Sequence, residues 1–279
     1  MKSNEKPYIL LAPLVIYVLF FFFGPFVSAF KLAFFNDAGK FTTRYLVETL
    51  KDVRFYSALK YTILFAITII PLQLITAFLV ALFITKTGSS TLMFISSIPL
   101  AISDLAAGLI FISIFSESGF LNSILFKLGF IDKPFYFLSY QHLNLLFLTI
   151  VVAEHWRATS IVLIILVAGL QMIEKDFHDA ASIFGAGFLK KTFYVTLPLL
   201  KPSIQSALII RTIFAFQMFA VVLALAGDMI PVLSGEAYFW YSLYRNPHIA
   251  AVYAMIIILI SILFTLIYFK TLRQREVVG

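Results

Sequence analysis

Uninterrupted apolar runs constrain this chain more than any other feature of its sequence. A bilayer core is about 30 Å thick, so a membrane-spanning helix needs roughly 20 consecutive apolar residues. Barrel strands instead alternate apolar and polar residues over about ten positions, and the apolar runs here do not alternate. The sequence therefore predicts an all-α integral membrane protein with six transmembrane helices. The predicted spans cover residues 8–31, 59–85, 91–115, 142–170, 203–227 and 248–269.

Composition agrees with the membrane class and with a single domain. Of the 279 residues, 61% are hydrophobic and only 13% are charged, whereas about a quarter of the residues in a soluble domain are charged. The formal charge of +7 is assigned to Lys and Arg residues that meet anionic lipid head groups, and no nucleic-acid partner is predicted. No internal repeat or separate soluble segment is visible, so residues 1–279 are interpreted as one transmembrane domain.

The first apolar run is interpreted as a retained span, because it exceeds the apolar core of about 7–15 residues that a cleaved signal peptide carries. Lys and Arg residues divide almost evenly between the two sides of the predicted helices. The basic excess that marks the cytoplasmic side of a membrane protein is therefore missing, and charge alone does not orient the chain.

A polar segment, residues 171–202, lies between the fourth and fifth predicted spans. We predict a short helix over residues 176–184 with Asp176 as its N-cap, a turn at Gly185, and a second helix from Phe188. A segment of this kind is either a docking surface for a protein outside the membrane or an amphipathic helix resting on lipid. The residue pattern alone favours neither.

The same segment resembles the EAA loop of the membrane subunits of ATP-binding-cassette importers. The family pattern is Glu-Ala-Ala followed by Gly and, further on, Pro, and it is matched by Asp179-Ala180-Ala181, Gly185 and Pro198. Further segments resemble other parts of sugar-importer permeases, and the resemblance covers most of residues 44–217. They are Arg44-Tyr45 through Phe55-Tyr56, Gly119-Phe120-Leu121-Asn122, and Trp156-Arg157 with Ala168-Gly169-Leu170. The long first helix is more similar to the F-type subunit of maltose transporters than to the G-type partner.

The chain also departs from the family pattern. Asp179 stands where the family usually has Glu, and Phe184 stands where it usually has Asp before the glycine. The Thr-Gly-Gly-Gly-Pro segment common after the fifth span is replaced by residues 226–235.

The resemblance implies a cytoplasmic coupling helix between helices 4 and 5, held in a cleft of an ATPase subunit. The residues that it assigns to this contact are Asp179, Ala180, Ala181, Phe184, Gly185 and Ala186. It also implies a second permease subunit, two ATP-binding-cassette ATPases that carry ATP and Mg²⁺, and an extracytoplasmic substrate-binding protein. The expected solute is a sugar or a related polyol. The expected location is the plasma membrane, with several spans and both termini in the cytoplasm.

No catalytic, cofactor or metal site is predicted in this chain. The nearest approach to a phosphate-binding loop runs from Gly185 to Thr192, but the second glycine is absent and no strand precedes it. The four histidines are scattered and form no metal-ligand spacing. ATP hydrolysis is therefore expected on separate subunits.

Several charged residues fall within the predicted spans. A charge at the bilayer centre costs about 2.5–3.5 kcal/mol on insertion scales, so each is expected to face protein or water. Glu154 and Arg157 share a helix face and either neutralise each other or line a polar path. Asp104 is assigned either to that path or to packing between helices, and Arg211 is placed within reach of the membrane surface. The residues predicted to face the solute are Asp104, Glu154, Trp156, Gln217 and Tyr253.

A rival hypothesis is a stand-alone secondary transporter driven by an ion gradient, which would use Asp104, Glu154 and Arg157 as a relay. Such transporters often contain paired repeats with interrupted helices, and no repeat is visible here. A membrane-bound enzyme is a third possibility, against which the scarcity of clustered polar residues argues.

Overall fold

The computed structural model describes residues 6–271, with side chains from residue 11 onward, and this part of the chain is helical apart from turns and one isolated bridge. The terminal residues 1–5 and 272–279, which are predicted to be cytoplasmic, lie outside the described residues. The α-helices in chain order are α1 Lys6–Val18, α2 Gly24–Phe34, α3 Arg44–Lys51, α4 Val53–Thr87, α5 Ser90–Ser97, α6 Asp104–Phe115, α7 Phe120–Lys127, α8 Leu143–Gln171, α9 Lys175–Ile183, α10 Phe188–Lys191, α11 Leu197–Leu199, α12 Lys201–Phe216, α13 Ala220–Ala226, α14 Leu233–Ser242 and α15 Pro247–Thr271.

Among the described residues, five helical segments are long and apolar enough to cross a membrane. A sixth is present if Phe188–Leu199 and Lys201–Phe216, which meet at an angle of 66°, are counted as one broken span. The prediction of an all-α membrane protein is therefore confirmed. The five segments are Leu11–Phe34, Val53–Thr87, Asp104–Lys127, Tyr140–Gln171 and Pro247–Thr271.

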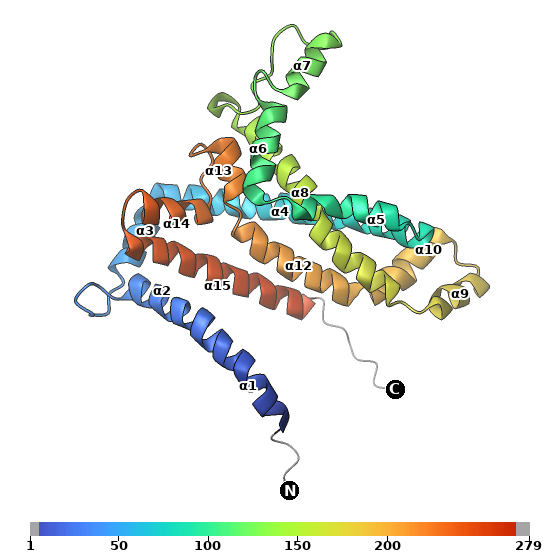
Figure 1. The fold of residues 1–279 in the computed structure, drawn as a ribbon, viewed down its shortest axis with the longest axis horizontal. Coiled ribbons are helices and arrows are strands. Elements are labelled where there is room, and N and C mark those ends of the chain that lie inside the picture. Colours follow the sequence, from blue (N-terminus) through green and yellow to red (C-terminus); the bar gives the residue numbers. More distant parts are fainter. Residues whose placement is uncertain (1–5, 272–279) are drawn as a thin grey trace. The chain divides into compact units, whose positions relative to one another are not determined.

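The chain divides into two compact units. The larger unit consists of Ser57–Val232 and the described residues from Ile260 onward. Within it, α8 packs along α12, and α6 packs against α13 (Figure 1). Two groups of buried apolar side chains form its core, one around Phe65, Ile150 and Val221 and the other around Leu163 and Leu200.

Close packing in the larger unit depends on small residues at the helix contacts. A Cβ atom added to Gly108 in α6 would lie 2.5 Å from Ala224 Cβ in α13. A Cβ atom added to Gly169 in α8 would lie 2.1 Å from Ser203 Oγ in α12. Small residues let membrane helices approach closely, so these two glycines set the spacing of both helix pairs.

The third predicted span, residues 91–115, is wrong as a single helix. The segment forms α5, a 3₁₀ turn over Ile98–Ala101, and then α6, which begins only at Asp104. Ser103 has extended backbone angles, and its hydroxyl accepts a hydrogen bond from the Ala106 N–H, so a serine N-cap starts a new helix here. Pro99 therefore lies in a break between two helices, and Asp104 lies at a helix start instead of mid-span.

The fifth predicted span, residues 203–227, is also broken. The helix ends at Phe216, and three residues, Gln217 to Phe219, separate it from α13. No proline or glycine marks this break, although the break in the third predicted span has Pro99 beside it.

Two further differences concern the loops. The helix after the fourth span begins at Lys175, and Glu174 occupies the N-cap position that was predicted for Asp176. The stretch over residues 228–247, which the sequence predicts to be a loop, contains α14. The sequence also predicts a short helix near Leu121–Leu128, and the structure has α7 there.

The smaller unit consists of the described residues up to Tyr56 together with Leu233–Leu259. Its core packs Ala33 at the end of α2 against Ala251, Val252 and Met255 of α15. Arg54 Nε lies 2.7 Å from Glu236 Oε1, and the Glu236 side chain is buried. This ion pair joins the start of α4 to α14.

Candidate functional site

The polar segment between α8 and α12 forms a helix, a tight turn and a second helix. The Ala186 N–H donates to the Ala181 carbonyl oxygen and the Gly185 N–H donates to the Ser182 carbonyl oxygen, each at 2.9 Å. These two bonds, with Gly185 at a φ of +74°, make the Schellman ending of a helix, in which a left-handed residue closes the last turn. The sequence therefore places a glycine where the backbone needs one.

The turn presents apolar side chains on an otherwise polar helix. Ile183 is 86% exposed and Phe184 is 90% exposed, while Asp179 and Ala180 are also exposed on α9. α9 carries both acidic and basic residues, so it is not a lipid-facing span. Exposed apolar side chains beside charged ones mark a surface that binds a protein or a membrane.

Two contacts fix the second half of this segment. Lys191 Nζ donates to Ser182 Oγ at 2.5 Å and ties the end of α9 to α10. Lys86, in the last turn of α4, lies over the Phe188 ring at 6.0 Å from its centroid. The first contact closes the turn from within, and the second joins α10 to α4.

A second set of polar residues is buried between the helices of the larger unit. Arg157 binds the Glu154 carboxylate through Nε and Nη2, at 3.2 and 3.0 Å, and binds Asp104 Oδ1 through Nη1 at 2.8 Å. Arg211 Nη2 lies 3.0 Å from Glu154 Oε1. We call Asp104, Glu154, Arg157 and Arg211 the buried charge cluster. It joins α6, α8 and α12.

The buried charge cluster contains two arginines and two carboxylates, so its formal charge is zero. The side chains of Glu154 and Arg211 are 2% and 1% exposed, whereas the Asp104 side chain is 45% exposed. A buried charge is tolerated when it is paired and hydrogen-bonded. Glu154 and Arg157, which share a helix face, pair with each other, and the Arg211 side chain points into this cluster.

Gln73 is a functional candidate that the sequence analysis did not identify. Its Oε1 accepts from Arg211 Nε at 2.8 Å, and its Nε2 donates to the Glu154 backbone carbonyl at 3.0 Å. It therefore adds α4 to the helices that the cluster joins. The available signal was a lone amide inside a long apolar run, since polar residues within spans are rare and usually have a role.

The residues predicted to face the solute occupy different environments. Asp104 and Trp156 are both partly exposed, and Trp156 contacts the Phe111 ring at 5.8 Å between centroids. Gln217 is exposed in the break that follows α12. Tyr253 is fully buried in the smaller unit, against the Phe55 ring.

The described residues contain no group of three or more His, Cys, Asp or Glu side chains that fits a metal ion. The charged groups of the buried charge cluster instead pair with one another and join the helices that carry them.

Several long apolar helices, some of them interrupted, define a multi-pass membrane protein. Residues 73–275 match the family of binding-protein-dependent transport system inner membrane components, and the chain belongs to this family. The resemblance identified from the EAA-like segment is thereby confirmed. The family is one of transport permeases.

Relatives in two organisms illustrate the match. The chain is 34% identical over 229 residues to the arabinooligosaccharides transport system permease protein of Bacillus subtilis strain 168, covering 78% of this chain and 71% of that protein. It is 28% identical over 288 residues to the trehalose/maltose transport system permease protein of Thermococcus litoralis, covering 99% and 96% of the two chains.

The fold also matches that of a solved transporter. A crystal structure of a bacterial ABC transporter involved in import of the acidic polysaccharide alginate contains a chain that superposes with a TM-score of 0.81. The match covers 99% of this chain and 97% of that chain at 19% identity. At this level of identity the match shows a shared fold.

Proposed function

We propose that this chain is one of two permease subunits of an ATP-driven importer for a sugar or a related polyol. The family is binding-protein-dependent, and the relatives described above are named for oligosaccharide and disaccharide transport. An extracytoplasmic binding protein, a second permease and two ATPases carrying ATP and Mg²⁺ complete the proposed assembly. The proposed location is the plasma membrane.

The observation that carries this proposal is the exposed turn that ends at Gly185. Asp179 supplies a carboxylate for a basic residue of the ATPase, and Phe184 supplies an apolar contact. Ala180 and Ala181 leave room for close approach, and Ala186 completes the turn. In this proposal the turn is cytoplasmic. Both termini then lie in the cytoplasm, and the loops before α4, α8 and α15 lie on the other side of the membrane.

We propose a solute path that includes Asp104, Trp156 and Gln217. Sugar sites combine polar groups that match hydroxyls with aromatic faces, and these three side chains are the exposed members of the predicted set. Glu154 and Tyr253 are buried. Glu154 acts on the path through Arg157, which it holds against Asp104, and Tyr253 supports the smaller unit from within.

The experiment changes Asp179 to Lys in the full assembly and measures both co-purification of the ATPase and ATP-dependent uptake. Both are expected to fall, because a lysine would meet a basic partner. Asp132→Lys, the same charge change in the loop after α7, is the matched control and is expected to leave both unchanged. Normal assembly and uptake in Asp179→Lys would argue strongly against the proposed contact.

The rival ion-coupled transporter makes a different prediction. Uptake that survives deletion of the ATPase gene but disappears when the ion gradient is collapsed would support it. The neutral pairing within the buried charge cluster argues against a relay, since each carboxylate is already bound to an arginine.

A further inference from the structure

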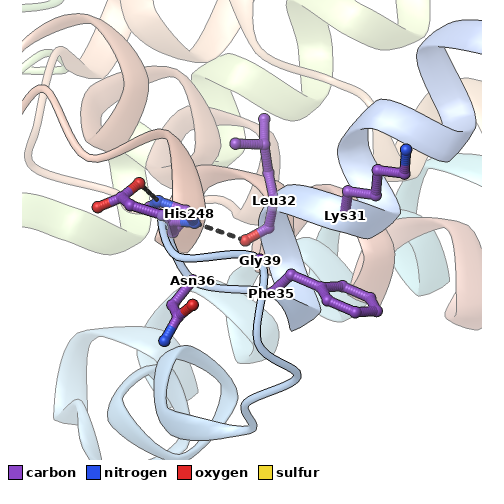
Figure 2. Close-up of a pocket in the computed structure, with 7 residues that line it drawn as sticks. Lys31, Leu32, Phe35, Asn36, Gly39 and His248 are labelled. Atoms are coloured by element: carbon purple, nitrogen blue, oxygen red, sulfur yellow. Dashed lines mark hydrogen bonds and ion pairs between the residues drawn. The ribbon is translucent and has the colours of Figure 1, made fainter.

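His248 lies at the start of α15 between two hydrogen-bond acceptors. Its Nδ1 is 2.8 Å from the Leu32 backbone carbonyl oxygen, and its Nε2 is 3.1 Å from Asp37 Oδ1. Its ring stacks on Tyr45 of α3, with centroids 4.3 Å apart and planes within 9°. Figure 2 shows the ring and the Leu32 carbonyl at the edge of a pocket in the smaller unit. None of these groups belongs to the proposed ATPase contact or solute path.

The segment that carries Asp37 is a preformed turn. Phe35 and Phe41 form a bridge, and the Asn36 N–H donates to the Lys40 carbonyl oxygen at 3.0 Å. Asn36 Oδ1 accepts from the N–H groups of Ala38 and Lys40 at 3.1 and 2.9 Å. Gly39, at a φ of +72°, closes the turn. We call residues 35–41 the Asp37 turn. Its internal bonds do not involve His248.

Both contacts of His248 are hydrogen bonds only when the ring is protonated. A carbonyl oxygen and a carboxylate oxygen are both acceptors, and a neutral imidazole carries one N–H, whereas an imidazolium carries two. The neutral ring therefore satisfies Leu32 or Asp37, but not both.

The electrostatic surroundings of the ring act in both directions. Leu32 belongs to the last turn of α2, whose free carbonyls favour a positive charge, and Asp37 is a carboxylate. The N-terminus of α15, on which His248 itself lies, has the opposite effect. Lys31 lines the same pocket, and its side chain points away from the ring (Figure 2). The other charged groups on the surrounding elements are Lys40 in the turn, Arg44, Glu48 and Lys51 of α3, and Arg245 just before α15.

We propose that His248 is a proton-operated clasp that holds the Asp37 turn on the start of α15. At acidic pH the imidazolium donates to Leu32 and to Asp37, and the turn is attached. As the pH rises and the ring loses a proton, one of the two bonds is lost. Leu32 is part of a helix, whereas the Asp37 side chain is 95% exposed, so the bond to the turn is the one released.

The test places a nitroxide at a single engineered cysteine, Lys40→Cys, in the full chain within its assembled transporter. The natural chain contains no cysteine, so this chain carries a single labelling site, and it is labelled before it is combined with its partner subunits. Spectra are recorded from about pH 5 to about pH 8, the range in which an ordinary histidine changes charge. The expected result is an immobile component at acidic pH that is lost toward alkaline pH.

Three variants in this background separate the clasp from other effects. His248→Asn carries no titrating ring, so its spectrum is expected to be independent of pH. Asp37→Ala removes the acceptor and is expected to be mobile throughout. His142→Asn changes an exposed histidine far along the sequence and is expected to keep the pH dependence. A pH-dependent spectrum in His248→Asn or Asp37→Ala, or a constant one in the Lys40→Cys parent, would overturn the proposal.

Nitrogen NMR of histidine-labelled chain gives an independent reading. The His248 signals are identified as those missing from the spectrum of His248→Asn. They are expected to show two protonated ring nitrogens at about pH 5. A single protonated nitrogen at that pH, with the turn still immobile, would also overturn the proposal.

Discussion

Arg211 and Glu154, 57 residues apart in sequence, meet through a 3.0 Å contact between Arg211 Nη2 and Glu154 Oε1. Both side chains are almost completely buried. The contact joins α12 to α8, and Arg157 extends it to Asp104 on α6. Removal of one partner from a buried ion pair leaves the other charge unpaired. The stability of the larger unit therefore depends on the four charges of the buried charge cluster together.

Replacing Glu154 with glutamine is expected to destabilise the chain by about 3–5 kcal/mol, because Arg211 would lose its buried countercharge and Arg157 would keep only the partly exposed Asp104. Thermal unfolding of the purified transporter in detergent measures this. Glu117→Gln, which neutralises an exposed carboxylate, is the control and is expected to have little effect. The double change Glu154→Leu with Arg211→Leu is expected to recover part of the loss, since apolar replacements of buried pairs are often tolerated. Wild-type stability in Glu154→Gln would contradict the prediction.

Gln73→Leu is expected to cost about 1.5–3 kcal/mol, the range for a hydrogen bond to a charged group, because Arg211 Nε loses its acceptor. Thr76→Ala is a control on the same helix, since the Thr76 hydroxyl bonds only to carbonyls of α4. The effect of Gln73→Leu is expected to shrink when Arg211 is already replaced by leucine, because residues in one network are coupled. Equal effects in both backgrounds would show that Gln73 acts elsewhere.

Gly169→Ala is expected to destabilise the chain by about 1–3 kcal/mol, the usual cost of overpacking a core. The added Cβ would meet the Ser203 side chain and the Leu200 Cδ1 atom, at 2.1 and 2.8 Å. Gly187→Ala provides the comparison, since nothing lies within 4 Å of a Cβ there and its φ of −70° is ordinary. The measurement is the unfolding temperature of each variant. Equal unfolding temperatures would refute the close contact of α8 with α12.

Gly185→Ala is expected to reduce ATP-dependent uptake more than Gly185→Asn does. An alanine in the left-handed conformation costs about 1–2 kcal/mol, whereas asparagine visits this conformation routinely. Gly187→Ala again serves as the control, because its backbone is not left-handed. The measurement is uptake at equal amounts of assembled transporter. If alanine and asparagine behaved alike at position 185, the turn would not depend on its backbone angles.

The sequence predicts the helices of this protein well wherever an apolar run ends at charged or turn-forming residues. The predicted span over 142–170 corresponds to α8, Leu143–Gln171, and Gly185 turns the chain where a glycine was expected to do so. The role of this turn in ATPase coupling stays a prediction.

The breaks in the third and fifth spans could not be read from hydropathy. Hydropathy does not distinguish the serine that caps α6 from a serine in the middle of a membrane helix. The residues around Gln217 contain no helix breaker. The buried charge cluster was only partly foreseen. The helical spacing of Glu154 and Arg157 predicts their contact, but their meeting with Gln73 and Arg211 depends on how three helices pack.

The 66° corner between Phe188–Leu199 and Lys201–Phe216 has a mechanical consequence. Leu200 lies at this corner and is completely buried in the core of the larger unit, so packing holds the corner in place. The axes of the two segments are nearer to perpendicular than to parallel. A force along Phe188–Leu199 therefore acts on Lys201–Phe216 mainly across its axis. The second segment carries Arg211, which is bonded to α4 and α8. Such a force is therefore expected to tilt α4, α8 and α12 together, and not to slide α12 along its neighbours.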